Sequence, residues 1–176
     1  IGGSLFIVTA GAAANLSEVP ARRVLFDEVD RAELNVNGEG DPVALAEARQ
    51  TTFERNRKSY YPSSPTIKDE SIVERLYLRG TQRHALADCL HCGAAQPLEF
   101  DRLMVSDDGQ SALYPCMHCG AVHTESDKPR MFARGAWSDG VGSGDGETES
   151  FTISSMFLPY GWLPWIALKR EYDKAK

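Results

Sequence analysis

The stretch RRVLFDEVD, residues 22–30, places a short apolar run directly before two carboxylates. Residues 24–26 have the composition of a β-strand, and Asp27 and Glu28 follow where that strand would end. An acidic turn is also a common way for a chain to return to water. This stretch alone therefore leaves two interpretations open, a catalytic strand end and a solvated turn.

Strand and helix patterns alternate around this stretch. Residues 4–11, SLFIVTAG, are apolar and rich in β-branched side chains, which predicts a buried parallel strand in a sheet interior. Residues 42–57 follow helical spacing, with Asp41 as the N-cap and a proline at the first helical position. A third strand in residues 58–66 precedes an amphipathic helix in residues 68–80. Such alternation predicts an α/β sheet.

The third predicted strand ends in hydroxyl groups, in the run Ser63-Ser64-Pro65-Thr66. Neighbouring parallel strands end at one edge of a sheet, so these hydroxyls would lie beside the acidic pair. In a nucleotide-hydrolysing P-loop fold, the first carboxylate at such an edge helps to hold Mg²⁺, and the next can orient and deprotonate water. This favours the catalytic interpretation, with Asp27 for Mg²⁺ and Glu28 for water.

The phosphate cradle of such a fold has no counterpart in these residues. The pattern G-x-x-x-x-G-K-[ST] does not occur in the sequence. Residues 140–148, GVGSGDGET, have the glycines without the lysine. We therefore expect that this chain does not bind ATP tightly by itself.

The four cysteines form two CxxC pairs, Cys89 with Cys92 and Cys116 with Cys119, each followed by glycine. Two thiolates at this spacing reach one tetrahedral Zn²⁺ from a tight turn, and glycine tolerates the backbone behind the second sulfur. We expect a closed, structural Cys₄ site in a zinc ribbon; disulfides and a redox-active pair are the weaker alternatives. Four sulfurs complete the tetrahedron, so no histidine is expected as a ligand. The histidines are His84, His91, His118 and His123.

The rest of the chain divides by composition. Residues 85–134 contain the cysteine pairs and, at residues 107–109, a hairpin turn between two short strands. Residues 135–150 are rich in glycine, serine and aspartate and predict an exposed flexible loop. Residues 151–176 begin as a strand and end as a helix. The helix face that we expect to pack in the core carries Trp165, Leu168 and Tyr172.

The formal net charge of -6 and the pI near 5.2 disfavour a free-standing nucleic-acid-binding domain. Any DNA contact would be local. A basic strip for it could come from Lys68, Arg75, Arg79 and Arg83, although a solvated helix face is the favoured interpretation of these residues. No run approaches the roughly 20 apolar residues needed to cross a bilayer. The first residue is isoleucine and no leader pattern precedes it, so we expect an internal piece of a longer protein.

Taken together, these segments resemble the large terminase subunit of lambda-like tailed phages over almost the whole chain. The resemblance is carried by DEVD (residues 27–30), EGDPVALAEAR (39–49), SPTIK (64–68) and the paired cysteine knuckles. It implies a DNA-packaging motor, in which an N-terminal ATPase of the additional-strand P-loop class drives double-stranded DNA into a procapsid. A C-terminal RNase H-like nuclease of the same protein would cut the concatemer.

The resemblance also implies roles for single residues. Asp27 matches the Mg²⁺-associated carboxylate, Glu28 the catalytic glutamate, and Ser64 with Thr66 the segment that couples hydrolysis to DNA movement. The four cysteines resemble the knuckle cysteines between ATPase core and nuclease. Further implications are ATP and Mg²⁺ in the full-length parent, an oligomeric ring, the small terminase subunit and portal protein as partners, and a location in the host cytoplasm, transiently at the procapsid portal.

The predicted fold class is therefore α/β, the C-terminal part of a P-loop (RecA-like, additional-strand) ATPase sheet with an inserted or appended Cys₄ zinc ribbon. Residues 1–84 would form the back half of the ATPase core, 85–134 the ribbon, 135–150 the loop, and 151–176 a strand and helix leading to a nuclease domain outside the chain. The phosphate-binding loop would also lie outside, so the fragment alone is expected to be inactive.

Two other functions stay open at this point. One is a lobe of a superfamily 2 helicase, in which DEVD and SPT would take the Mg²⁺-binding and coupling positions. The other is a non-enzymatic zinc-ribbon binding module whose acidic residues are merely solvated.

Overall fold

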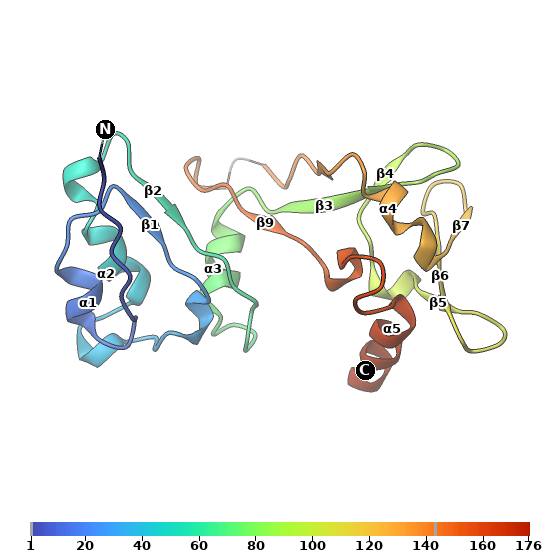
Figure 1. Cartoon of the computed structure of the whole chain (residues 1–176), viewed down its shortest axis with the longest axis horizontal. Helices are drawn as coiled ribbons and strands as arrows, with labels where there is room; N and C mark the ends of the chain where they lie inside the picture. Colours follow the sequence, from blue (N-terminus) through green and yellow to red (C-terminus); the bar gives the residue numbers. More distant parts are fainter. Residues whose placement is uncertain (1, 143) are drawn as a thin grey trace. The chain divides into compact units, whose positions relative to one another are not determined.

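A computed structural model describes residues 2–142 and 144–176 (Figure 1). Contacts divide the chain into two compact units, Ile1–Leu76 and Tyr77–Lys176, and each unit has a buried apolar core of its own. Both contain short helices and small sheets, so the α/β class is confirmed in this coarse sense. No helix in the described ranges is long and apolar enough to cross a membrane.

A two-stranded parallel sheet forms the centre of the first unit. Strand β1 (Arg23–Leu25) pairs with β2 (Lys58–Tyr60), as predicted from their composition. Two further backbone bonds, from the N–H of Phe26 at 3.0 Å and from that of Glu28 at 2.9 Å, continue the pairing past the strand ends. The segments that follow the two strands therefore stay side by side at one edge of the sheet.

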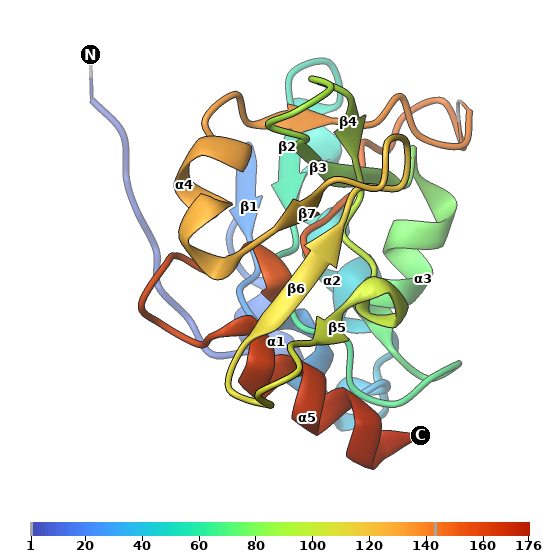
Figure 2. The same cartoon turned by 90° about the vertical axis from the view of Figure 1, so that its right-hand side faces the viewer.

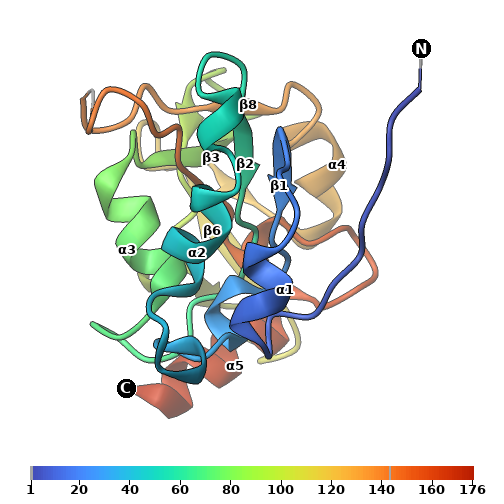
Figure 3. The same cartoon turned by 90° about the vertical axis from the view of Figure 1, so that its left-hand side faces the viewer.

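Helices supply the apolar partners of this sheet. Helix α2 (Pro42–Ala48) and helix α3 (Ile72–Arg79) pack their buried side chains with Phe26 and Val29. Asp41 caps α2, since its carboxylate accepts the N–H groups of the second and third helical residues at 2.9 and 3.0 Å, which confirms the predicted cap. Figure 3 shows α1 beside α2. The remaining helical segments are α1 (Ala13–Ser17), η1 (Val29–Arg31), η2 (Val36–Gly38) and η3 (Thr51–Phe53).

The helix predicted over residues 42–57 ends at Ala48, so the prediction was wrong for its second half. The side chain of Gln50 is buried, and its Nε2 donates to the carbonyls of Arg22 and Lys58 at 3.2 and 3.0 Å, beside the starts of both strands. Two β-branched threonines follow, which weaken helix propensity. The hydrogen bonds of Gln50 to the two strands, together with the threonines, therefore account for the end of α2 at Ala48.

The buried strand predicted in residues 4–11 was also wrong. That segment has no strand in the part of the chain that the structure describes, and the apolar side chains of residues 5–8 are between 55% and 89% exposed. A buried strand needs neighbours on its edges and faces. The sheet of this unit consists of β1 and β2, neither of which pairs with residues 4–11.

The second unit contains two groups of strands (Figure 2). In the first, β3 pairs antiparallel with β4 and β8 and parallel with β9. In the second, β6 lies between β5 and β7, and the β5–β6 hairpin confirms the predicted turn at residues 107–109. The strands are β3 (Arg83–Asp88), β4 (Ala95–Gln96), β5 (Met104–Val105), β6 (Ala112–Pro115), β7 (Val122–His123), β8 (Ala136–Trp137) and β9 (Phe151–Thr152).

The helical segments of this unit complete its core. Trp165 and Leu168 of the last helix are buried, and Tyr172 stacks on Phe100 with ring centroids 5.1 Å apart, which confirms the predicted packing face. Trp165 Nε1 donates to the carbonyl of Met156 at 2.9 Å. The helical segments are η4 (Phe100–Arg102), η5 (Glu125–Asp127), α4 (Lys128–Met131), η6 (Ser155–Phe157) and α5 (Trp165–Ala175).

The segment of residues 135–150 differs from a loop without regular structure. It contains β8, and two backbone bonds, from Ser138 to His84 at 2.9 Å and from Val141 to Thr81 at 3.1 Å, join it to the β3 region. The carboxylate of Asp145 accepts the side chain and N–H of Thr148 and the N–H of Glu147, and these hydrogen bonds lower the pKa of Asp145 to about 2. Local polar contacts thus organise a glycine-rich segment.

Candidate functional site

The acidic pair lies directly after β1, and both side chains are exposed. Asp27 Oδ1 accepts the N–H of Glu28 at 3.1 Å. Glu28 has left-handed backbone angles, φ 50 and ψ 47, which cost a residue with a Cβ about 1–2 kcal/mol. Its carboxylate lies 4.0 Å from Arg31 Nε, but both side chains are more than half exposed, so this ion pair contributes little. The turn presents two carboxylates to solvent at the sheet edge.

Asp30, the last residue of DEVD, joins this turn to two distant segments. Its Oδ1 accepts the N–H of Val73, in the first turn of α3, at 2.6 Å. Its Oδ2 accepts the N–H and the hydroxyl of Thr66 at 2.9 and 3.0 Å. The N–H of Asp30 in turn donates to Ser63 Oγ at 3.2 Å. One side chain therefore connects the ends of β1 and β2 with the start of α3.

The charge of Asp30 is favoured by these contacts. Partial burial by itself raises the pKa of the carboxyl, but hydrogen bonds from Val73, Ser71 and Thr66 outweigh it and hold the pKa below its usual value. An ionised carboxylate at the first turn of a helix also faces the positive end of the helix dipole. Asp30 is thus a cap for α3 that comes from 43 residues away.

Only some of the predicted site residues contact the acidic turn. Thr66 is linked to the acidic turn through Asp30, and Ser63 takes the position beside it. Among the hydrogen bonds of residues 2–142 and 144–176, none joins the Ser64 side chain to this turn. Asp30 was assigned no role from the sequence, whereas Ser63 belonged to the run of hydroxyls predicted to lie beside the acidic pair. The one signal for Asp30 was a third acid in the turn, and its partners could not be identified without the fold.

The four cysteines form a compact cluster, as their spacing predicted. Their Sγ atoms all lie within 4.8 Å of one another, with 3.7 Å between Cys89 and Cys119 and 3.9 Å between Cys92 and Cys116. A tetrahedron of sulfurs at about 2.3 Å from Zn²⁺ has edges of about 3.8 Å. The donor set therefore fits a tetrahedral metal, with no histidine among the clustered ligand atoms of the described residues.

Each cysteine pair is held by the same backbone turn. The first knuckle joins β3 to β4 and the second joins β6 to β7. The N–H of Gly93 donates to the carbonyl of Cys89 at 2.9 Å, and that of Gly120 to Cys116 at 3.0 Å. Both glycines have positive φ, 72 and 74, which a side chain would strain. The glycine after each CxxC pair is therefore required by the turn.

The sulfurs differ in their surroundings. Cys89 and Cys116 are buried, whereas Cys92 and Cys119 are exposed. Burial raises the pKa of Cys116, but N–H groups of the knuckle and neighbouring thiols outweigh it and lower the pKa to about 6. The Ala121 N–H lowers the pKa of Cys119, yet burial and the adjacent sulfurs raise it to about 12. The neighbouring thiols thus favour ionisation of Cys116 and oppose ionisation of Cys119, and a bound cation would relieve that opposition.

Two further polar side chains support the knuckles. Gln96 is fully buried, and its Oε1 accepts the N–H of Met117, inside the second knuckle, at 2.8 Å. The Nε2 of His123 lies 3.3 Å from Cys89 Sγ. Gln96 was assigned no role from the sequence, and His123 was considered only as a ligand and excluded, because these contacts join segments 21 and 34 residues apart.

The arginines considered as a basic strip are paired with acids. Arg75 contacts the carboxylate of Asp41, Arg79 Nε lies 3.1 Å from Asp145, and an Arg83 nitrogen lies 3.3 Å from Glu149. These side chains are partly exposed, so each pair stabilises the fold only weakly. Their charge is nevertheless largely neutralised, which agrees with a solvated face more than with a strip for DNA. The partners are Asp41, Asp145 and Glu149.

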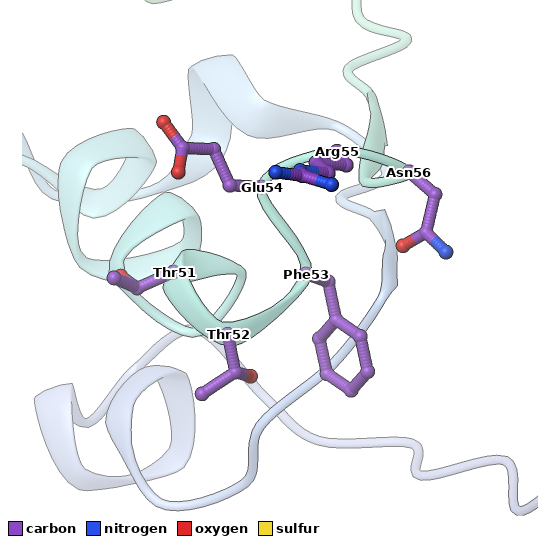
Figure 4. A pocket seen from close by; sticks show the side chains of 6 residues that line it. All are labelled: Thr51, Thr52, Phe53, Glu54, Arg55 and Asn56. Carbon is purple, nitrogen blue, oxygen red and sulfur yellow. The ribbon is translucent and has the colours of Figure 1, made fainter.

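A depression of about 340 Å³ lies on the turn that follows α2. Figure 4 shows that it is lined by six consecutive side chains, in which the polar groups of Glu54 and Asn56 point away from each other. Most of these side chains are exposed. Because the polar groups do not converge, we assign no chemistry to this depression.

In a comparison with protein families, residues 1–137 match the phage terminase large subunit gpA ATPase domain. No curated protein and no solved structure matches the chain. The matched region includes the acidic turn, the Ser63–Thr66 segment and both cysteine knuckles. It covers more than three quarters of the 176 residues. The chain therefore belongs to the family of phage terminase large subunit gpA ATPase domains.

Proposed function

We propose that this chain is part of an ATP-hydrolysing motor that packages double-stranded DNA into phage procapsids. The observation that carries the proposal is the bonding of Asp30, which ties the acidic turn to Thr66 and to α3. Membership of the terminase family supports an ATPase and favours it over the helicase and binding-module alternatives. We further propose that the sheet belongs to a P-loop ATPase fold.

In the proposed reaction, the substrate is ATP with its Mg²⁺ ion. Asp27 would help to hold that ion, and Glu28 would orient the attacking water and accept its proton. The bond from the Glu28 N–H to Asp27 Oδ1 holds the Asp27 carboxylate against the backbone of Glu28, and the left-handed backbone of Glu28 sets the direction in which its own side chain leaves the turn. These two residues would divide metal binding and water activation between them.

Coupling of hydrolysis to DNA movement would pass through Asp30. A shift of the acidic turn changes the position of the carboxylate that Thr66 and α3 both use. We assign Thr66 to this coupling segment, together with Ser64, whose hydroxyl would reach the nucleotide side. The hydrogen bonds of Asp30 to Thr66 and Val73 would then transmit the change at the γ-phosphate to the rest of the motor.

We also propose that the cysteine cluster holds one structural Zn²⁺. Cys89, Cys92, Cys116 and Cys119 would be its ligands, and a site closed by four sulfurs leaves no position for a substrate. The ion would tie the two knuckles together, as in a zinc ribbon. In this proposal residues 1–84 belong to the ATPase core, 85–134 to the ribbon, 135–150 to a connecting loop and 151–176 to the segment leading to a nuclease.

The partners proposed for the motor are those of its family. They are double-stranded DNA, the small terminase subunit and the portal protein, with the motor acting as an oligomeric ring in the host cytoplasm, transiently at the procapsid. Cutting of the DNA concatemer is proposed for a nuclease of the same protein, and no residue of this chain is assigned to it.

The test is Glu28→Gln in the full-length terminase, with DNA-stimulated ATP hydrolysis as the measurement. Loss of a general base lowers kcat by about 10²–10⁴-fold, while nucleotide binding should persist. Glu33→Gln, at an exposed position in the same region, is the matched control and should hydrolyse ATP at the normal rate. Full activity of the Glu28 variant would reject the proposed role.

A further inference from the structure

We propose that His123 is a positioning residue of the metal site, whose Nε2–H donates a hydrogen bond to the Cys89 sulfur and so tightens metal binding. The inference rests on the proposed Zn²⁺ site and adds a residue to its outer shell. His123 would not be a ligand. It would act through one of the ligands.

The position of His123 favours this role. The residue ends β7 and is 1% exposed, and its Nε2 lies 3.3 Å from Cys89 Sγ. Its backbone partner across the hairpin is Tyr114 of β6, which is fully buried. Cys89 follows β3, so the contact joins a strand of one hairpin to the knuckle of the other. Packing fixes the ring where water has little access to replace it.

The chemistry sets the direction of the bond. A cysteine that binds a metal is a thiolate, and a thiolate can only accept hydrogen bonds. The Nε2 atom of His123 must then carry the proton. Donors from outside the ligand set hold a ligand in place and tune the metal, and removing such partners commonly weakens metal binding by about 10–100-fold.

Cys89 receives more N–H groups than its counterpart in the second knuckle. The backbone N–H groups of His91 and Cys92 point to Cys89 Sγ at 3.4 and 3.5 Å, and His123 adds a third donor. Cys116 accepts the N–H of His118 at 3.4 Å in the corresponding place. Four thiolates on one divalent ion leave a net negative charge, which these N–H groups disperse. Of the three donors to Cys89, only His123 disperses this negative charge through a side chain.

The experiment compares three variants in the full chain: His123→Phe, which keeps a ring but removes the donor, His123→Gln, which keeps an N–H, and His118→Phe as control. His118 has an exposed side chain in the second knuckle. Zn²⁺ affinity is measured by competition with a chromophoric chelator. We expect about 10-fold weaker binding for His123→Phe, substantial recovery for His123→Gln, and no change for His118→Phe.

A spectroscopic readout separates this role from simple packing. With Co²⁺ in the site, loss of a donor to sulfur should move the sulfur-to-cobalt charge-transfer band to lower energy in His123→Phe but not in His123→Gln. Equal Zn²⁺ affinity and an unmoved band in His123→Phe would overturn the inference. Weaker binding with an unmoved band, not recovered by Gln, would also overturn it, since packing alone would then account for the effect.

The wild-type protein gives an independent check that needs no variant. ¹⁵N spectra of the Zn²⁺-loaded chain report which ring nitrogen of His123 carries hydrogen, and an unprotonated Nε2 would refute the hydrogen bond. If the wild-type chain binds no Zn²⁺ at all, the proposed metal site fails, and this inference fails with it. If the wild-type chain binds Zn²⁺ normally, and the His123→Phe variant has the same Zn²⁺ affinity and the same charge-transfer band, the proposed metal site stands and only the role of His123 is refuted.

Discussion

Replacing Asp30 by alanine should destabilise the first unit by about 2–4 kcal/mol. Its carboxylate accepts three hydrogen bonds, at 2.6, 2.9 and 3.0 Å, from Val73 and Thr66. A hydrogen bond to a charged group contributes about 1.5–3 kcal/mol, and a helix cap about 1 kcal/mol. Because Asp30 is only partly buried and Thr66 is exposed, water would replace part of what is lost, and the total falls below the sum of the three bonds.

The assay should report on residues near the change. All three tryptophans, Trp137, Trp162 and Trp165, belong to the second unit, so their fluorescence is a poor probe of the first. Amide hydrogen exchange of Val73 and Thr66, measured by NMR, directly reports the loss of the hydrogen bonds to Asp30. A loss of about 2 kcal/mol corresponds to about 30-fold faster exchange at these two amides.

The effect of Asp30 should also depend on pH. Its pKa in the folded protein is lower than in the unfolded chain, so its stabilisation is fully present above about pH 4 and is lost as the pH falls through the lower, folded-state pKa. The difference in unfolding free energy between wild type and Asp30→Ala should be constant above about pH 4 and shrink below it.

The matched control is Asp27→Ala in the same turn. Its carboxylate is exposed and accepts one bond, from Glu28 at 3.1 Å, so a change within about 0.5 kcal/mol is expected. Unaltered exchange at Val73 and Thr66 in Asp30→Ala, with an unfolding midpoint equal to that of the control, would refute the reasoning about Asp30.

Two other predictions concern the second unit. Lys128 is 1% exposed, and its Nζ lies 2.5 Å from one carboxylate oxygen of Glu125. The other oxygen of Glu125 accepts the N–H of Trp165 at 2.7 Å. Glu125→Gln should therefore lower the free energy of unfolding by about 3 kcal/mol, measured by urea unfolding followed through tryptophan fluorescence. Glu171→Gln, in an exposed ion pair, is its control, and a cost below about 1 kcal/mol for Glu125→Gln would contradict a buried pair. If the proposed Zn²⁺ is bound, removing it with a chelator should make the four cysteine thiols reactive and shift the emission of Trp165 to longer wavelength, because metal binding contributes to folding. Unchanged thiol reactivity would exclude a bound metal.

The features predicted correctly from the sequence depend on neighbours along the chain. The cap of α2 needs only Asp41 and the residues after it, and the cysteine cluster follows from the spacing within each pair. Strands β1 and β2 were found from composition, and their parallel pairing from the helical segment between them. In each case the decisive residues lie within a few positions of one another or belong to a common motif.

The features that were missed depend on distant contacts. Gln50 ends α2 by binding carbonyls at both strands, and no local pattern indicates this. Asp30 and His123 act on groups 34 to 43 residues away, so their partners become visible only when the chain is folded. The apolar run at residues 4–11 misled because hydrophobic composition indicates a tendency to be buried, whereas burial also requires a surface that receives it.

That apolar run has a consequence for work with the chain in solution. The side chains of residues 5–8 are uncharged, contain no proline and favour extended structure, and they stand in water with unpaired backbone on both sides. Segments of this kind adhere to copies of themselves and nucleate aggregates. We therefore expect self-association through these four residues to limit the concentration at which the purified protein stays monodisperse. This limit should depend on salt and temperature, and less on the stability of either buried core.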